Sequence, residues 1–195
     1  MKKIVYFLLL ICCSMACAQN KNAELISQFE NYHQLLIEQK YAEAIDRYTP
    51  EAILRIYPKK QLVESMEKLF NNRKFKTVMQ IPMAINIQDF DFEKQGDKYR
   101  ILSANQGLNL EILDAQIIKN KDEILPFFER KFGKENVKYD DTHHQILVQS
   151  KIEAVALSQD GAAWKFLLTD QAPASLLQKI LPKEVWTHLK IVNNK

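Results

Sequence analysis

In the first third of the chain, apolar residues recur at intervals of three and four positions. This spacing is typical of amphipathic helices, and it predicts helices over 22–39, over 41–48 and from Pro58 to about residue 70. Six residues of the first segment share one face of their helix: Leu25, Phe29, Tyr32, His33, Leu36 and Ile37. Pro50 ends the second helix, because the residue before a proline avoids the helical region.

From residue 78 onward, the spacing between apolar residues shortens to two positions. Between 78 and 90, apolar and polar residues alternate, which predicts a strand with one buried face. Pro82 lies within this strand and cannot donate a ladder hydrogen bond, so we expect it at a sheet edge or at a bulge. Residues 98–113 predict a second long strand that bends or bulges at Gly107.

The second half of the chain predicts more strands and two helical additions. Residues 137–158 are extended, and the Gln-Asp-Gly sequence at 159–161 predicts a hairpin turn into a strand that begins near residue 163. An inserted helix is predicted near 122–132, and a C-terminal helical extension over 173–190. Helices followed by antiparallel strands predict an α+β fold, with the helices on one face of a curved sheet.

Three segments carry a resemblance to a known family. They are the helical stretch FENYHQLLIEQKYAEAIDRYTPEAI, the helix PKKQLVESMEKL and the strands that end in DGAAWKFLL. In this order they resemble the NTF2-like superfamily, the cone-shaped α+β fold shared with ketosteroid isomerases and SnoaL-type cyclases. The resemblance covers about residues 22–170 and implies a single domain over 19–195. The segment 114–135 is longer than its counterpart in that family, and a cystatin-like wrap around one helix is the alternative layout.

The N-terminus has the pattern of a secretory signal peptide. Lys2 and Lys3 form a positive start, residues 4–13 are an unbroken apolar run, and residues 14–18 are small and uncharged. The apolar run is shorter than the roughly 20 residues that a membrane-spanning helix needs. We therefore expect residues 1–18 to direct export, which makes the protein periplasmic or secreted.

Two processing routes are consistent with this segment. Ala16-Cys17-Ala18 is an A-x-A site, which predicts cleavage between Ala18 and Gln19 and release of the protein. The sequence Ser14-Met15-Ala16-Cys17 also resembles a bacterial lipobox, in which Cys17 becomes the acylated first residue. Release makes the protein soluble, whereas acylation of Cys17 anchors it to a membrane.

Composition excludes several classes of protein. Removing 18 of the 195 residues leaves 177, enough for one self-sufficient core. All three cysteines lie in the signal peptide, so the mature domain has no disulfide and no cysteine-based zinc or thiol chemistry. The net charge of +3 falls to about +1 without Lys2 and Lys3, which argues against a nucleic-acid partner. The four glycines lack the spacing of a nucleotide-binding loop, and we expect no cofactor.

The resemblance to the NTF2-like superfamily implies a pocket between the first helices and the concave face of the sheet. We take Tyr32, His33, Tyr48 and Tyr99 as candidate ligand-binding residues there, because they offer ring faces and polar tips. For His33 the structural interpretation competes with the functional one, since a lone histidine on an apolar helix face is usually buried and hydrogen-bonded. Trp164, near the last strand, is expected to be buried.

Acid–base chemistry of the isomerase kind needs a carboxylate in an apolar setting. Glu111 and Glu153 interrupt apolar strand sequences, and Asp46 lies on the second predicted helix, but none belongs to a recognisable motif. The adjacent pair His143 and His144 does not predict a metal site, because neighbouring strand residues point to opposite faces.

These observations leave three hypotheses. The first is an exported, non-catalytic domain that binds a small apolar ligand or a protein partner. The second is an enzyme of the same fold, a proton-transfer isomerase or a hydrolase. The third is a structural module whose sheet forms a homodimer. Fold alone does not choose between them, and the absence of a catalytic motif makes us favour binding.

Overall fold

The computed structural model describes residues 22–170 and 172–193, with the side chains described up to residue 189. The predicted signal peptide over 1–18 lies outside the described residues, as do the two candidate processing points, Cys17 and the bond between Ala18 and Gln19.

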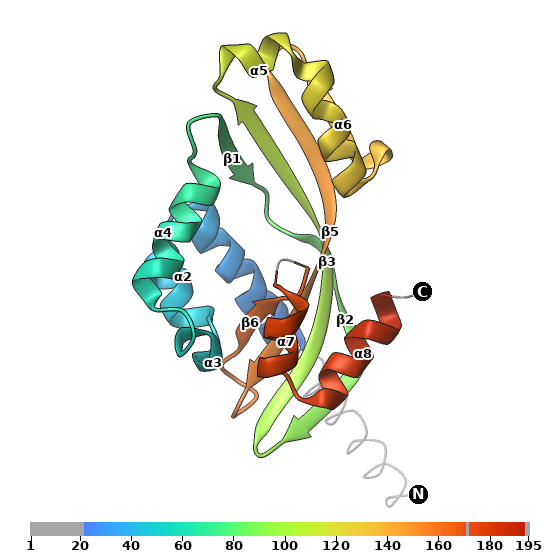
Figure 1. Ribbon diagram of the computed structural model, residues 1–195. Coiled ribbons are helices and arrows are strands. Elements are labelled where there is room, and N and C mark those ends of the chain that lie inside the picture. The colour runs from blue at the N-terminus through green and yellow to red at the C-terminus, as the bar shows by residue number, and fades with distance from the viewer. Residues whose placement is uncertain (1–21, 171, 194–195) are drawn as a thin grey trace, which may run out of the picture.

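The strands form one curved, unclosed antiparallel sheet (Figure 1). They are β1 (Phe75–Met79), β2 (Met83–Lys94), β3 (Asp97–Ile112), β4 (Val137–Asp140), β5 (Gln145–Ser158) and β6 (Lys165–Leu168). The long strands β3 and β5 pair with each other over nearly their full length. β1 and β2 extend the sheet beyond β3, and β4 and β6 extend it beyond β5.

The helices precede, interrupt and follow this sheet. They are the first helix (22–37), α2 (Tyr41–Tyr48), α3 (Glu51–Leu54), α4 (Lys59–Phe70), α5 (Ala115–Lys119), α6 (Lys121–Phe132), the 3₁₀ turn η1 (Lys134–Asn136), α7 (Ala174–Ile180) and α8 (Lys183–Asn193). The predicted α+β class, with N-terminal helices on a curved antiparallel sheet, is confirmed. Helices also occupy the positions expected near 122–132 and after Pro173.

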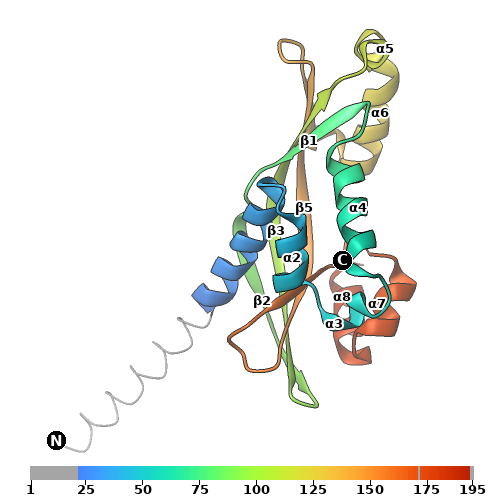
Figure 2. The same ribbon diagram turned by 90° about the vertical axis from the view of Figure 1, so that its left-hand side faces the viewer.

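In one half of the molecule, helices cover both faces of the sheet, so the prediction that the helices lie on one face is wrong there. The first helix, α2 and α4 pack on one face, against side chains that include Leu102 and Ala154 (Figure 2). α7 and α8 pack on the other face, against Ile101 and Val155. Because successive strand residues point to opposite faces, neighbouring residues of β3 and β5 belong to two different cores. We call this half the body.

The other half, which we call the tip, comprises β1 and residues 106–150. Here α5 and α6 cover one face of the sheet over a small core, and Figure 1 shows both helices at the top of the molecule. Its buried residues are Ile112, Val137, Ile146 and Val148. The opposite face carries polar and charged side chains, including the ion pair of Lys76 with Glu111 at 3.7 Å, and it exposes Val78.

The predicted single strand over 78–90 is wrong, because the chain forms β1 and β2 with a break around Pro82. Both strands pair with β3. β2 has register shifts after Met83 and after Ile87, and each shift inserts unpaired residues that can change the face a strand presents. Ile87 therefore packs on the core below the first helix, whereas Phe90 packs on the core below α8.

Two further strand predictions need correction. The pairing of β3 with β5 continues without a shift through Gly107, so the bulge considered there is absent, whereas β2 carries the register shifts. The extended segment predicted over 137–158 is interrupted by a turn at 141–144. Asp140 causes this turn, because its carboxylate accepts hydrogen bonds from the backbone N–H groups of Thr142 (2.9 Å) and His143 (3.2 Å).

Candidate functional site: a groove beside the first helix

Three of the four residues expected to contact a ligand lie together inside the body. The ring of Tyr32 is 5.1 Å from that of His33 and 5.8 Å from that of Tyr48, measured between centroids. Phe166 of β6 packs on both tyrosines. All of these side chains are buried, so they fill the space between the first helices and the sheet. Tyr99 packs in the core on the opposite face of the sheet.

Burial favours the uncharged forms of Tyr32 and His33. It lowers the pKa of His33 to about 4 and raises the pKa of Tyr32 to about 12. The Nδ1 atom of His33 lies 2.9 Å from the carbonyl oxygen of Phe29, and since a carbonyl only accepts, Nδ1 carries the proton. Among the described residues, Nε2 of His33 has no hydrogen-bond partner. At neutral pH this arrangement is suited to packing rather than to proton transfer.

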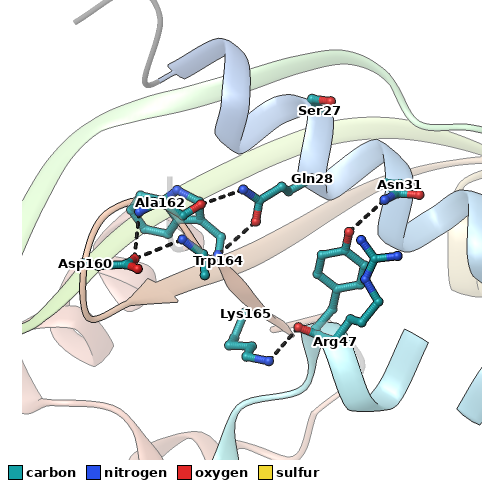
Figure 3. Close-up of a pocket in the computed structure, with 10 residues that line it drawn as sticks. Ser27, Gln28, Asn31, Arg47, Asp160, Ala162, Trp164 and Lys165 are labelled. Carbon is teal, nitrogen blue, oxygen red and sulfur yellow. Dashed lines mark hydrogen bonds between the residues drawn. The ribbon is translucent and has the colours of Figure 1, made fainter. Parts of the chain in front are cut away.

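A groove opens on the outer side of this core, with a cavity volume of about 620 Å³. It lies between the first helix, the end of α2 and the turn that joins β5 to β6 (Figure 3). The side chains that line it include Gln28, Asn31, Arg47, Tyr48, Trp164 and Lys165. Tyr48 is thus the one expected ligand residue that the structure places at the groove.

The turn between β5 and β6 forms one wall of the groove and is held by Asp160. Its carboxylate accepts hydrogen bonds from the backbone N–H groups of Ala162 (2.8 Å) and Ala163 (2.9 Å) and from the Ser158 hydroxyl (3.0 Å). These bonds, led by the one from Ala162, lower the pKa of Asp160 to about 2. Gly161 adopts a φ of +77°, which favours glycine. The wall therefore has a fixed shape and a permanent negative charge.

Gln28 connects this turn to the first helix. Its side-chain amide donates to the carbonyl oxygen of Ala162 at 2.6 Å and accepts from the backbone N–H of Trp164 at 2.9 Å. Figure 3 shows both bonds as dashed lines between Gln28 and the turn. Trp164 itself is buried, as expected, and its Nε1 atom has no hydrogen-bond partner within the described part of the chain. One glutamine thus fixes two walls that are far apart in the sequence.

The opposite wall is the C-terminal end of α2. Lys165 donates to the carbonyl oxygens of Arg47 (2.6 Å) and Asp46 (3.3 Å), a favourable place for a cation because helix C-termini carry partial negative charge. The Arg47 guanidinium lies 5.3 Å from the centre of the Tyr48 ring and 3.1 Å from Glu43. Asn31 donates to the Tyr48 hydroxyl at 2.9 Å.

The groove can therefore offer hydrogen bonds more readily than charge. Arg47, Lys165 and Asp160 are each already engaged with groups of the same chain. An amide such as that of Asn31 has two donor and two acceptor positions, and a guanidinium has five donors. The hydrogen bonds of Asn31 to Tyr48 and of Arg47 to Glu43 leave other donor positions on both side chains for a bound molecule.

Each acid considered for catalysis is engaged with a group other than the tyrosines. Glu111 lies on the outer face of the tip, and Asp46 pairs with Lys59 on the surface. Glu153 is buried and accepts hydrogen bonds from Gln88 and Thr169, both at 3.2 Å.

The pairing of β3 with β5 shows how far Glu153 is from Tyr99. Glu153 lies opposite Ser103, four residues along β3 from Tyr99, which corresponds to about 13 Å in a strand. Tyr32 packs on the other face of the sheet. The carboxylate and the phenol hydroxyls that an isomerase-like site requires therefore do not converge here.

His143 and His144 lie in the turn of the tip. His143 Nδ1 is 2.7 Å from Asp140, and His144 Nδ1 is 3.3 Å from the Tyr139 hydroxyl. Within residues 22–170 and 172–193, no three His, Cys, Asp or Glu side chains are grouped so that they could hold a metal ion. In the same residues, no helix combines the length and apolar character needed to cross a membrane.

Comparisons of the chain with protein-family models, with curated proteins and with solved structures found no match.

Sequence reasoning missed most of the groove. Gln28 and Asn31 lie beside the apolar face of the first helix, where polar residues are expected for solubility alone. Asp160 was recognised as part of a turn, but nothing in the sequence shows that this turn packs on a helix more than 130 residues earlier. The one available signal was that Gln28 and Asn31 lie three residues apart at the border of the apolar face, which places both side-chain amides on the same side of the helix.

Proposed function

We propose that this protein is an exported, non-catalytic binding domain with an NTF2-like fold, and that its ligand binds in the groove beside the first helix. The observation that carries the proposal is the contrast between two spaces. The space between the helices and the sheet is filled by buried aromatic side chains, whereas the groove is open and its walls are fixed by hydrogen bonds. Preformed walls lower the entropic cost of binding.

The chemistry of the groove favours a small, polar and uncharged ligand, such as a saccharide or a compound with amide groups. Its volume falls within the range of about 300–1,000 Å³ that small-molecule sites occupy. An anionic ligand would have to compete with Glu43 for Arg47, and a cationic one would meet Asp160 already surrounded by three donors. A neutral ligand can use the remaining hydrogen-bonding positions of Asn31 and Arg47 without displacing an ion pair.

The assignment to an exported NTF2-like domain is supported by the signal-peptide pattern and by the order of helices and strands. Binding is favoured over catalysis because Glu111 and Glu153 lie away from the groove, and the carboxylate of Asp46, at the end of α2, is paired with Lys59. Glu153 is enclosed on the face of the sheet that α7 and α8 cover, and Glu111 is at the tip.

Ligand-observed NMR tests the proposal with a panel of neutral saccharides and small amides, and with matched carboxylates and amines. We expect binding of neutral members to the mature protein and at least a tenfold weaker affinity in Asn31→Ala. Asn105→Ala, which changes an exposed asparagine of β3, is the matched control and should bind as the unaltered protein does. Binding that is equal in Asn31→Ala, or that is confined to charged members, would refute the proposal. Conversion of a bound compound to product would favour the enzyme hypothesis instead.

A further inference from the structure

The outward side of α6 has an unusual order of residues. Its exposed positions form one continuous face, because they recur in pairs every four residues: Asp122 and Glu123, then Pro126 and Phe127, then Arg130 and Lys131. Phe127 is 55% exposed, whereas its neighbour Phe128 packs into the core of the tip. The face thus has an acidic turn, an apolar turn and a basic turn in succession.

This helix is weakly held within its own chain. None of its twelve residues is buried, and the side chains that pack on the tip core are only partly covered. Pro126 lies inside the helix, where it lacks the N–H that would close a backbone hydrogen bond. A second surface that covered Pro126 and Phe127 would add apolar contact where the single chain has little.

The order of charges on α6 is complementary to itself. Phe127 lies at the middle of the helix, with the acidic turn on one side and the basic turn at a similar distance on the other. Two such helices side by side and antiparallel would place Asp122 and Glu123 of one copy beside the basic turn of the second copy, with the two Phe127 rings in contact. The helix dipole accounts for acids at the start and bases at the end, but not for an exposed phenylalanine between them.

We infer that α6 forms a two-fold, antiparallel contact with α6 of a second copy of this chain. The contact is isologous, since the same surface serves on both copies. A helix of twelve residues is about 18 Å long, so a contact along it covers less than the roughly 800 Å² per partner of a standard stable interface. The dimer is therefore reversible and forms at high local concentration. It lies at the tip, away from the groove, and does not depend on what the groove binds.

Sedimentation velocity of the mature chain, from about 5 μM to 1 mM, tests this contact. We expect a dimer whose fraction rises with concentration and falls with salt, because its charge pairs are exposed. Phe127→Asp should abolish the dimer without lowering the thermal midpoint. Leu69→Asp changes an equally exposed residue of α4 and should leave the dimer intact. A chain that stays monomeric to 1 mM, or a dimer that persists in Phe127→Asp, would overturn the inference.

Charge reversal tests the antiparallel geometry separately. Glu123→Arg and Arg130→Glu should each weaken association several-fold, and the double variant should restore it because the two charges then exchange places. The mature chain after residue 17 has no cysteine, so a single introduced thiol reports proximity. Phe127→Cys should form a disulfide-linked dimer on mild oxidation, whereas Leu69→Cys should not. Equal cross-linking of the two variants, or no rescue in the double variant, would contradict a contact through α6.

Discussion

The body and the tip are built on the same two strands, yet they bury very different amounts of apolar surface. In the body, helices cover β3 and β5 on both faces, over two cores that hold most of the buried apolar residues in the described part of the chain. In the tip, α5 and α6 cover one face, over a core of four. The same pair of strands thus continues without a break from a region where helices cover both faces of the sheet into a region where they cover one. Because local stability follows buried contacts, we expect the body to hold the fold and the tip to open first.

The burial pattern along β5 differs between the two halves. In the tip, its residues alternate between buried Ile146 and Val148 and more exposed neighbours, which is the pattern of a strand with one solvated face. In the body, Ile152 through Ala156 are all buried, and the alternation disappears because both faces are covered. The change of pattern marks the boundary between the two halves.

The largest expected effect is on the core of the body. Trp164→Ala should lower the free energy of unfolding by about 3–5 kcal/mol, because Trp164 is only 5% exposed and its removal leaves a cavity. Phe128→Ala, in the half-covered core of the tip, should cost clearly less. Urea unfolding followed by circular dichroism measures both. Similar losses for the two variants would show that the tip is as tightly packed as the body.

The second effect is a loss of stability in acid, which we assign to His33. The folded protein holds His33 neutral with a pKa of about 4, whereas the unfolded chain takes up a proton near pH 6.5. As the pH falls through this window, protons bind the unfolded state preferentially, and about 3 kcal/mol of stability is lost. The stability of the protein should therefore fall relative to that of His33→Leu by about 3 kcal/mol between pH 6.5 and 4. Parallel curves between pH 6.5 and 4 would show that His33 takes up its proton equally in both states.

A smaller effect is expected from the bridge between the first helix and the β5–β6 turn. Gln28→Ala removes two hydrogen bonds to the backbone, which together contribute about 1–3 kcal/mol. Hydrogen exchange at the amide of Trp164 should accelerate, and the groove should lose ligand affinity. Gln34→Ala is the control, because the side-chain amide of Gln34 donates to Glu38 one turn away on the same helix and does not bridge to the β5–β6 turn. Unchanged protection of Trp164 in Gln28→Ala would show that the bridge does not hold the turn.

The smallest effect belongs to the surface of the tip. Phe127→Ser should change the unfolding free energy of the monomer by less than about 0.5 kcal/mol, because its side chain is mostly in solvent already. Chemical denaturation at low micromolar concentration, where the chain is monomeric, measures this. A loss above 1 kcal/mol would mean that Phe127 supports the tip within a single chain.

Much of the fold could be predicted because the periodicity of apolar residues differs between helices and strands. Pro82 was expected at a sheet edge or a bulge, but the division of the strand into β1 and β2 was not, since Met79, Ile81, Met83 and Ile87 continue the same alternation through it. In the structure Met79 is buried and Met83 is 57% exposed, so one apolar pattern covers two different environments. Alternation of apolar and polar residues shows that a strand has one buried face, but it does not show where the backbone shifts register.

The candidate site was predicted less completely than the fold. Tyr32, His33 and Tyr48 were expected to lie together, and they do, because helical spacing and a short connection place them on one core. Tyr99 belongs to the other core. Because both faces of the sheet are buried there, the pattern of apolar residues does not show on which face Tyr99 lies. The groove depends on Gln28 meeting a distant turn, a long-range contact that local patterns do not encode.

The bridge from Gln28 also determines when the groove can exist during synthesis of the chain. Gln28 is made early, but the carbonyl and N–H groups that it binds follow 134 and 136 residues later. Contacts of such long sequence separation form late, since the intervening chain must be closed into a loop first. A nascent chain that ends before residue 164 can form the first helix, but it lacks the groups that Gln28 binds and so has no complete groove. The groove is therefore complete only in molecules that have finished both synthesis and folding.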